Sequence, residues 1–348
     1  ELEALEAEVT RSGHSIEHTQ AIEAKRAEWE QAEQEREKWS EENFNKLTPK
    51  EKQLHERAFC TNLTDPSYHE LTEITYKDGD TERTVKVPKG DIFHQFRQDV
   101  NSGKLPTVSW LVAPCNFSDH PGSAWFGAWY VSEALDILTK NPEVWKKTIF
   151  ILTYDENDGY FDHVPPFVPP HPSKPNTGKV SQGIDTSVEY VLKEQDLKRK
   201  PEKDARESPI GLGYRVPLVI ASPWSRGGNV CSEVFDHTSP LQFLEVFLSH
   251  KTGKKIQEPN ITAWRRTVCG DLTSAFHPYQ GEKVATPPAL KRDAVVEAIH
   301  RAKFQKLPTE QRPLSATEQE QTRAGSRTVL PKQEKGTRPS CALPYEML

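Results

Sequence analysis

The feature that most constrains this chain is a short apolar run that leads directly into a crowd of carboxylates. Residues 148–152 (Thr-Ile-Phe-Ile-Leu) are β-branched, aromatic and apolar, which predicts a buried strand. Four acidic residues follow within eight positions: Asp155, Glu156, Asp158 and Asp162. Like charges held this close repel one another unless a cation or solvent screens them. Oxygen ligands with a nearby histidine suit a metal ion, and a solvated acidic turn at 157–159 (Asn-Asp-Gly) is the alternative.

The order of the predicted elements favours an α/β fold. Strands and helices alternate through the central part of the chain: strands over 107–113, 148–154 and 216–222, helices over 124–140 and 239–250. Such alternation is typical of a parallel sheet. Ligands bind beyond the carboxyl ends of strands in open α/β sheets, which is where the acidic run stands.

The remaining segments differ in composition. Residues 1–60 are charged with sparse apolar positions, which predicts solvated helices, and Thr48 is placed to cap a helix that begins at Pro49. Residues 61–280 hold the α/β elements, with a hairpin insertion predicted over 71–88 from alternation around an Asp-Gly turn. Residues 281–348 are expected to form a helix and then a disordered or weakly ordered tail.

Charge and cysteine usage argue against several classes of protein. The formal net charge of −6 argues against a nucleic-acid scaffold. No apolar stretch reaches the roughly 18 residues that a membrane span requires. The five cysteines lie far apart and form no Cys-x-x-Cys pair, so they do not predict a cysteine-ligated zinc site. The chain starts at Glu1 without a signal peptide, which suggests a fragment or a processed product.

Several ordered segments resemble the phosphoesterase family of the alkaline-phosphatase-like superfamily. Four carry the match: 153–166, 106–121, 211–217 (Gly-Leu-Gly-Tyr-Arg-Val-Pro) and 235–239 (Phe-Asp-His-Thr-Ser). Two further segments, 125–133 and 264–271, resemble the phosphocholine-specific bacterial phospholipases C, of haemolytic and non-haemolytic type, more than the acid phosphatases. The resemblance covers roughly residues 45–280. It implies a partial alkaline-phosphatase-like sheet with flanking helices, the C-terminal part of a catalytic domain.

The resemblance also implies a function and a site. It implies metal-dependent hydrolysis of phosphatidylcholine and related lipids to diacylglycerol and phosphocholine, at a membrane or lipid surface, by a secreted or periplasmic enzyme. Asp155 and Glu156 are the implied ligands of a divalent ion whose identity stays open. His120 and His237 are the implied catalytic residues. The resemblance implies that His120 is a ligand or a proton donor to the leaving group, and that His237 lies near the metal or phosphate and helps to hold or neutralise the charge there. Five residues are expected to orient these groups: Asp119, Asp158, Asp162, His163 and Asp236.

Three questions stay open at this point. Related enzymes carry the hydroxyl nucleophile on a segment that has no counterpart here, so the nucleophile is expected upstream of Glu1. An acid phosphatase of the same superfamily and a non-catalytic metal-binding fragment are the alternative functions. Arg215 is suited either to a phosphate diester or to a surface carboxylate.

Overall fold

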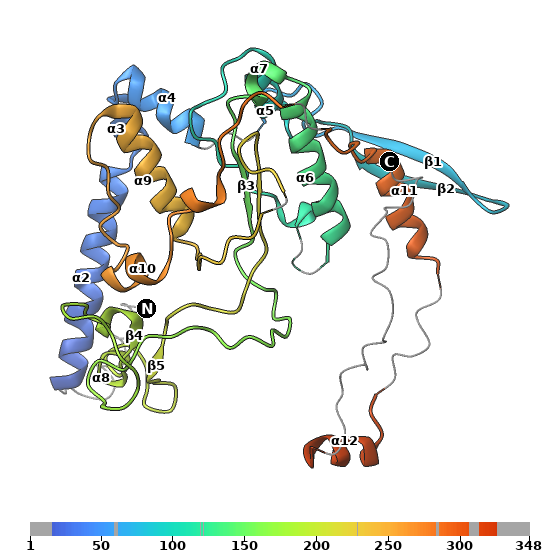
Figure 1. The fold of residues 1–348 in the computed structure, drawn as a ribbon. Coiled ribbons are helices and arrows are strands. Elements are labelled where there is room, and N and C mark those ends of the chain that lie inside the picture. Colours follow the sequence, from blue (N-terminus) through green and yellow to red (C-terminus); the bar gives the residue numbers. More distant parts are fainter. Residues whose placement is uncertain are drawn as a thin grey trace. The chain divides into compact units, whose positions relative to one another are not determined.

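The structure, a computed structural model, describes residues 16–58, 62–118, 120, 122–227, 229–282, 285–305 and 313–325. The chain divides into two compact units. The N-terminal unit comprises residues 1–70 and 90–95, and the larger unit comprises residues 71–89 and 96–348. Figure 1 labels the elements of both.

The N-terminal unit is built from helices: α2 (Ile16–Lys38), α3 (Glu41–Asn45) and α4 (Pro49–Ala58). No side chain of α3 or α4 is buried, which confirms the prediction of solvated helices there. The predicted cap at Thr48 is also confirmed. Its Oγ1 accepts a hydrogen bond from Glu51 N at 3.3 Å, and the Glu51 carboxylate accepts one from Thr48 N at 2.8 Å. The Thr48 hydroxyl also donates to the Glu51 carboxylate at 2.7 Å, and this bond first and the bond from Thr48 N second hold the pKa of Glu51 below its usual value.

The hairpin predicted over 71–88 is confirmed in the larger unit. β1 (Leu71–Asp78) and β2 (Thr81–Pro88) pair antiparallel along their whole length. Tyr76 and Val87 are buried on one face of the hairpin. Helix α11 (Arg292–Ala302) contacts β1, and the Tyr76 hydroxyl lies 2.8 Å from Nδ1 of His300 on that helix.

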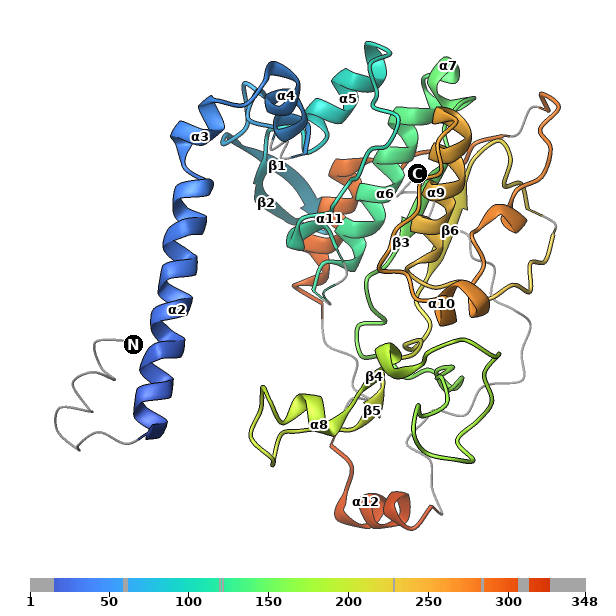
Figure 2. The ribbon, with the colours of Figure 1, turned by 90° about the vertical axis from the view of Figure 1, so that its left-hand side faces the viewer.

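Helix α6 (Ala124–Thr139) supplies much of the core of the larger unit and confirms the helix predicted there. It contacts α11, as Figure 2 shows, and α7 (Pro142–Trp145) follows it. Arg97 of α5 (His94–Asn101) donates to the Glu133 carboxylate at 2.7 Å. The buried side chains of α6 and α11 are apolar or aromatic: Trp129, Tyr130, Ala134, Ile137, Leu138, Val295 and Val296.

The two central strands run antiparallel, so the parallel arrangement predicted from sequence is wrong. β3 (Phe150–Thr153) pairs with β6 (Leu218–Ala221), with Phe150 opposite Ala221. A parallel pair needs a crossover that carries the chain back along the first strand, usually through a helix. Residues 154–217 are all described, and their only α-helix is α8 (Lys193–Asp196), of four residues. The chain instead returns to the sheet beside the end of β3, where Tyr154 N donates a hydrogen bond to Pro217 O at 3.3 Å.

Residues 107–113 form no strand, which contradicts the prediction for this segment. Trp110 is 67% exposed and Val112 is 81% exposed. Both two-residue alternation and apolar side chains are present, but no described strand pairs with the segment. A strand is stable only when a neighbouring strand forms hydrogen bonds with its backbone N–H and C=O groups. None of the described strands does this for residues 107–113. The segment continues into the short 3₁₀ helix η1 (Cys115–Phe117).

The remaining elements are short, apart from α9 (Ser239–Thr252), which confirms the helix predicted from Ser239. β4 (Tyr190–Val191) follows the 3₁₀ helix η2 (Ser187–Glu189) and pairs antiparallel with β5 (Ser208–Pro209). After α9 come the helix α10 (Ala263–Val268) and the 3₁₀ helix η3 (Thr273–Ala275). α11 is the helix predicted after residue 281. Within the predicted tail, residues 313–325 are described and include α12 (Ala316–Arg323), which buries none of its side chains. Among the described helices, none combines the length and apolar character that crossing a membrane requires.

An ion pair joins the segment that leaves β3 to the segment that enters β6. Arg215, just before β6, donates from Nε to Asp162 Oδ2 at 2.9 Å and from Nη2 to Oδ1 at 2.7 Å. The Asp162 side chain is only 8% exposed. Arg215 is therefore the main reason that the pKa of Asp162 lies well below its usual range. Of the two roles open to Arg215, the structure shows the carboxylate partner.

Replacing Asp162 with Asn tests this ion pair through its pH dependence. A lowered folded-state pKa stabilises the protein above the unfolded-state value near about 3.9, and this stabilisation is lost as the pH falls through the folded value. We expect Asp162→Asn to lower Tm at neutral pH. The difference from wild type should stay constant down to about pH 5 and shrink below about pH 4. Thermal melts across pH measure it, with Asp80→Asn at the exposed hairpin turn as control. A difference that does not change with pH would contradict the ion pair.

Candidate metal centre

The chain turns sharply after β3, as the sequence Asn-Asp-Gly predicts. Asp158 and Gly159 have left-handed backbones, with φ of 54° and 73°. Asn157 holds the turn, because its Oδ1 accepts from Gly159 N at 3.3 Å and its Nδ2 donates to Tyr160 O at 2.7 Å. Asp tolerates this conformation better than most residues with a Cβ. The turn redirects the chain directly after Glu156.

Three side chains meet at this turn: His120, Glu156 and Asp158. One nitrogen of the imidazole and one oxygen of each carboxylate all lie within 4.8 Å of one another. Ligand atoms that share one ion at bond lengths of about 2.0–2.5 Å stand at such separations. The donor set of one nitrogen and two carboxylate oxygens suits a divalent transition ion.

Asp158 gives a second, independent indication of a cation. Its Oδ2 atom is buried and has no hydrogen-bond partner among the described residues. Burying a polar atom without a partner costs about 1–3 kcal/mol, and more when the group is charged. His120 and Glu156 are exposed, so the cluster is open to solvent. A cation bound at the Asp158 oxygen would remove this penalty, so the residues present fit a metal ion.

The structure places the other predicted residues of the acidic run outside this cluster. Asp155 is exposed, and its Oδ1 accepts a hydrogen bond from Glu156 N at 3.0 Å. Successive residues at a strand end point to opposite sides, which separates Asp155 from Glu156. Asp162 is paired with Arg215, and the His163 side chain is 80% exposed with its Nδ1 3.9 Å from Asp162. Asp119 lies outside the described residues.

His237, the second predicted histidine, lies at the end of β3. Its Nε2 is 2.8 Å from the backbone oxygen of Tyr154, the residue before Asp155. A carbonyl oxygen only accepts hydrogen bonds, so Nε2 carries the hydrogen. Nδ1 is then the ring atom left to bind an ion or to carry a proton.

Asp236 holds the turn that contains His237 through hydrogen bonds to Thr238 and Arg265. Its Oδ1 accepts from Thr238 N at 2.8 Å and from Thr238 Oγ1 at 2.6 Å. Its Oδ2 accepts from Arg265 Nη1 at 2.7 Å. Asp236 also lies near the buried thiol of Cys269, whose pKa is raised to about 12 by burial first and by this carboxylate second.

Arg265 joins this turn to a second carboxylate that sequence reasoning did not identify. It donates from Nε and Nη2 to the two oxygens of Glu189, at 2.9 and 2.8 Å, and from Nη2 to Gly211 O at 2.7 Å. The Glu189 side chain is 2% exposed. No local pattern reveals this pair, because the two residues are 76 positions apart. The only sequence signal was the position of Arg265 inside the family-like segment 264–271.

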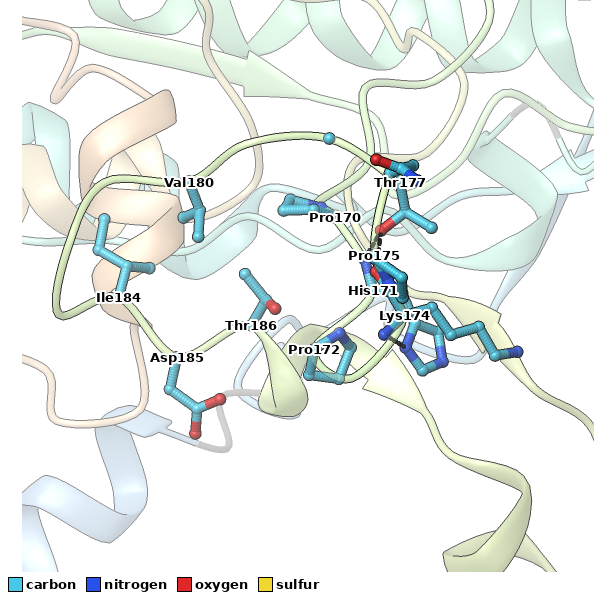
Figure 3. A pocket seen from close by; sticks show the side chains of 12 residues that line it. Pro170, His171, Pro172, Lys174, Pro175, Thr177, Val180, Ile184, Asp185 and Thr186 are labelled. Atoms are coloured by element: carbon cyan, nitrogen blue, oxygen red, sulfur yellow. Dashed lines mark hydrogen bonds between the residues drawn. The ribbon is translucent and has the colours of Figure 1, made fainter.

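A pocket of about 240 Å³ lies apart from this set of residues in the proline-rich loop that follows it. Figure 3 shows His171 and Lys174 on one side of the pocket, and Ile184 and Asp185 on the other. The His171 ring is already engaged, with Nδ1 accepting from Lys174 N at 3.2 Å and Nε2 3.3 Å from Glu207. None of the predicted site residues lines this pocket.

Replacing Arg265 with Met tests whether the buried pair holds the His237 turn. Removing one partner leaves Glu189 as an uncompensated buried charge, so we expect a loss of about 3–5 kcal/mol in the free energy of unfolding. Arg292→Met is the matched control, since Arg292 pairs with the exposed Asp293, and it should cost less than about 1 kcal/mol. Urea unfolding measures both. Equal effects of the two substitutions would show that the Arg265 pair has no special role.

Comparison with known proteins identifies relatives over the part of the chain that contains these residues. The model of the Phosphoesterase family matches residues 57–248. A non-hemolytic phospholipase C of Pseudomonas aeruginosa is 44% identical over 257 residues, 72% of this chain and 33% of that protein. A non-hemolytic phospholipase C of Burkholderia pseudomallei is 39% identical over 262 residues, 74% of this chain and 33% of that protein.

A hemolytic phospholipase C of Pseudomonas aeruginosa is 39% identical over 283 residues, 78% of this chain and 33% of that protein. The chain spans about a third of the length of these three relatives. The family match includes the β3 strand, the acidic turn and both candidate histidines. Because that match covers more than half of its 348 residues, the chain belongs to the phosphoesterase family.

Proposed function

We propose that this chain carries the metal centre of a phospholipase C that hydrolyses phosphocholine lipids to diacylglycerol and phosphocholine. The observation that carries the proposal is the meeting of His120, Glu156 and Asp158 around an unpartnered carboxylate oxygen. Membership of the phosphoesterase family and relatives named phospholipase C support the reaction class. The preference for phosphocholine lipids rests on the resemblance of segments 125–133 and 264–271. The extracytoplasmic location that the resemblance implies is part of the same proposal.

In this proposal Glu156, Asp158 and His120 would hold a divalent ion. Asp155 lies outside their cluster, and its predicted role as a ligand stays a prediction. An ion held there would neutralise charge on the phosphoryl group and polarise its oxygen. The carboxylates fix the position of that charge because the Asn157 hydrogen bonds hold their turn. His120 lies within the cluster, which favours the ligand role over the proton-donor role for this residue.

His237 is proposed to serve the departing oxygen. Its Nε2 hydrogen is committed to Tyr154 O, so Nδ1 is the atom that can deliver a proton. As the phosphorus–oxygen bond to glycerol breaks, that proton passes to the oxygen of diacylglycerol, and water supplies the new oxygen on phosphocholine. Asp236 and Arg265 act by holding the turn on which His237 stands.

Metal binding tests the ligand set without requiring turnover. We expect the wild-type chain to bind one Mn²⁺ in calorimetric titration, and Glu156→Gln or Asp158→Asn to weaken binding by at least about 10–100-fold. Glu202→Gln, at an exposed glutamate, is the control. Without metal, Asp158→Asn should melt at or above the wild-type temperature, since it removes a buried unpartnered charge. Wild-type affinity in both cluster variants would exclude this ligand set.

Turnover tests the reaction. We propose to assay p-nitrophenylphosphorylcholine with this chain and with a version extended upstream to the length of its relatives. In whichever version is active, Asp158→Asn and His237→Asn should lower kcat by about 10²–10⁴-fold. Preference for p-nitrophenyl phosphate would favour the acid-phosphatase alternative. Metal binding without turnover in either version would favour a non-catalytic metal-binding fragment.

A further inference from the structure

We propose that residues 160–168, named here the interfacial loop, dock the protein onto a bilayer of zwitterionic phosphocholine lipids. The inference rests on the proposed lipid substrate and names the element that meets the lipid surface. The loop leaves the candidate metal centre directly after Asp158 and Gly159. Most of its apolar side chains are exposed: Tyr160 by 63%, Phe161 by 77%, Val164 by 39%, Phe167 by 57% and Val168 by 42%.

The loop is held by hydrogen bonds while Tyr160 and Phe161 stay exposed, and Phe167 stacks on the Trp264 ring with centroids 5.8 Å apart. Asp162 is the anchor, because its side chain is 8% exposed and accepts hydrogen bonds from Arg215 and from Val164 N at 3.1 Å. The residues on either side of it, Phe161 and His163, are largely exposed. Asn157 also holds the Tyr160 carbonyl. A loop that is already ordered loses less conformational entropy when it binds a surface.

The backbone of the loop is suited to a medium that is poor in water. Moving an unpaired N–H group out of water is costly, and each proline lacks that group. Pro165 and Pro166 lie in the middle of the loop. Tyr and Trp are also the residues that favour the boundary between lipid and water, where the ring is apolar and the polar atom stays wet.

The charge of the segment selects a neutral surface over an anionic one. Residues 154–173 contain no Lys or Arg. Asp155, Glu156 and Asp158 precede the loop, and Asp162 is neutralised by Arg215. An anionic bilayer would be repelled by these carboxylates, whereas a zwitterionic one would not.

The position of the loop favours lipid over a protein partner. A phosphocholine lipid presents its phosphate at the bilayer surface, so a centre that cleaves it must lie against that surface. The residues next to Asp158 are then the first to meet the bilayer, and they include the exposed aromatic residues Tyr160 and Phe161.

Vesicle sedimentation with the full chain tests the proposal directly. We expect Phe161→Ser to weaken partition into phosphatidylcholine vesicles by about tenfold, because an exposed aromatic ring loses its apolar burial in the interface. Tyr160→Ser should act in the same direction and Phe161→Leu should retain most of the binding. Trp39→Ser is the matched control, since Trp39 is 74% exposed on the N-terminal unit, and it should bind as wild type does. Equal circular-dichroism melts establish that the variants fold.

Several outcomes would overturn the docking proposal. One is that the wild type does not bind phosphatidylcholine vesicles, or that Phe161→Ser binds them as the wild type does. Another is that the wild type binds more tightly to vesicles that contain phosphatidylglycerol. A third is that Phe161→Ser changes the oligomeric state without changing vesicle binding. Sedimentation needs no turnover, so its result is separate from the proposed function. Loss of vesicle binding by Phe161→Ser in a protein that never hydrolyses p-nitrophenylphosphorylcholine would leave docking standing and reject the activity.

Discussion

The antiparallel pairing of β3 with β6 is the constraint on which the rest of the site depends. It brings the segment that leaves β3 and the segment that enters β6 to one end of the sheet, where Asp162 meets Arg215. Leu212 N donates to Phe167 O at 2.9 Å, and Gly211 O accepts from Arg265. A parallel pair would have sent these segments to opposite ends of the strands. The Asp162–Arg215 ion pair and the contacts of Gly211 and Leu212 therefore follow from one choice of strand direction.

Charge compensation then separates the carboxylates into two kinds. Asp162 and Asp236 each have an arginine, so their charges are neutralised and their positions are fixed by hydrogen bonds. Asp158 has a buried oxygen without a partner in the described part of the chain. A carboxylate that already holds an arginine has little left to offer an ion, whereas an unpartnered one gains from it. This contrast, more than the number of acidic residues, identifies the candidate ligands.

Local patterns predicted what depends on neighbours in sequence. Apolar runs identified β3, β6 and α6, alternation identified the β1–β2 hairpin, and Thr48 identified the start of α4. Strand direction was missed because it depends on the route of residues 154–217. The segment 107–113 has the pattern of a strand but no described partner. Asp158 was expected only to orient the ligands, because its place in the cluster depends on its left-handed backbone. Glu189 was missed because its partner is remote in sequence.

The most direct test of the metal centre is anomalous diffraction from crystals of the chain soaked in Mn²⁺. We expect one strong anomalous peak within about 2.0–2.5 Å of a His120 nitrogen and of oxygens from Glu156 and Asp158. Asp162 should keep its contacts with Arg215 in the same crystals. A peak bound by Asp162 or His163 instead, or no peak at the acidic turn, would exclude His120, Glu156 and Asp158 as the ligand set.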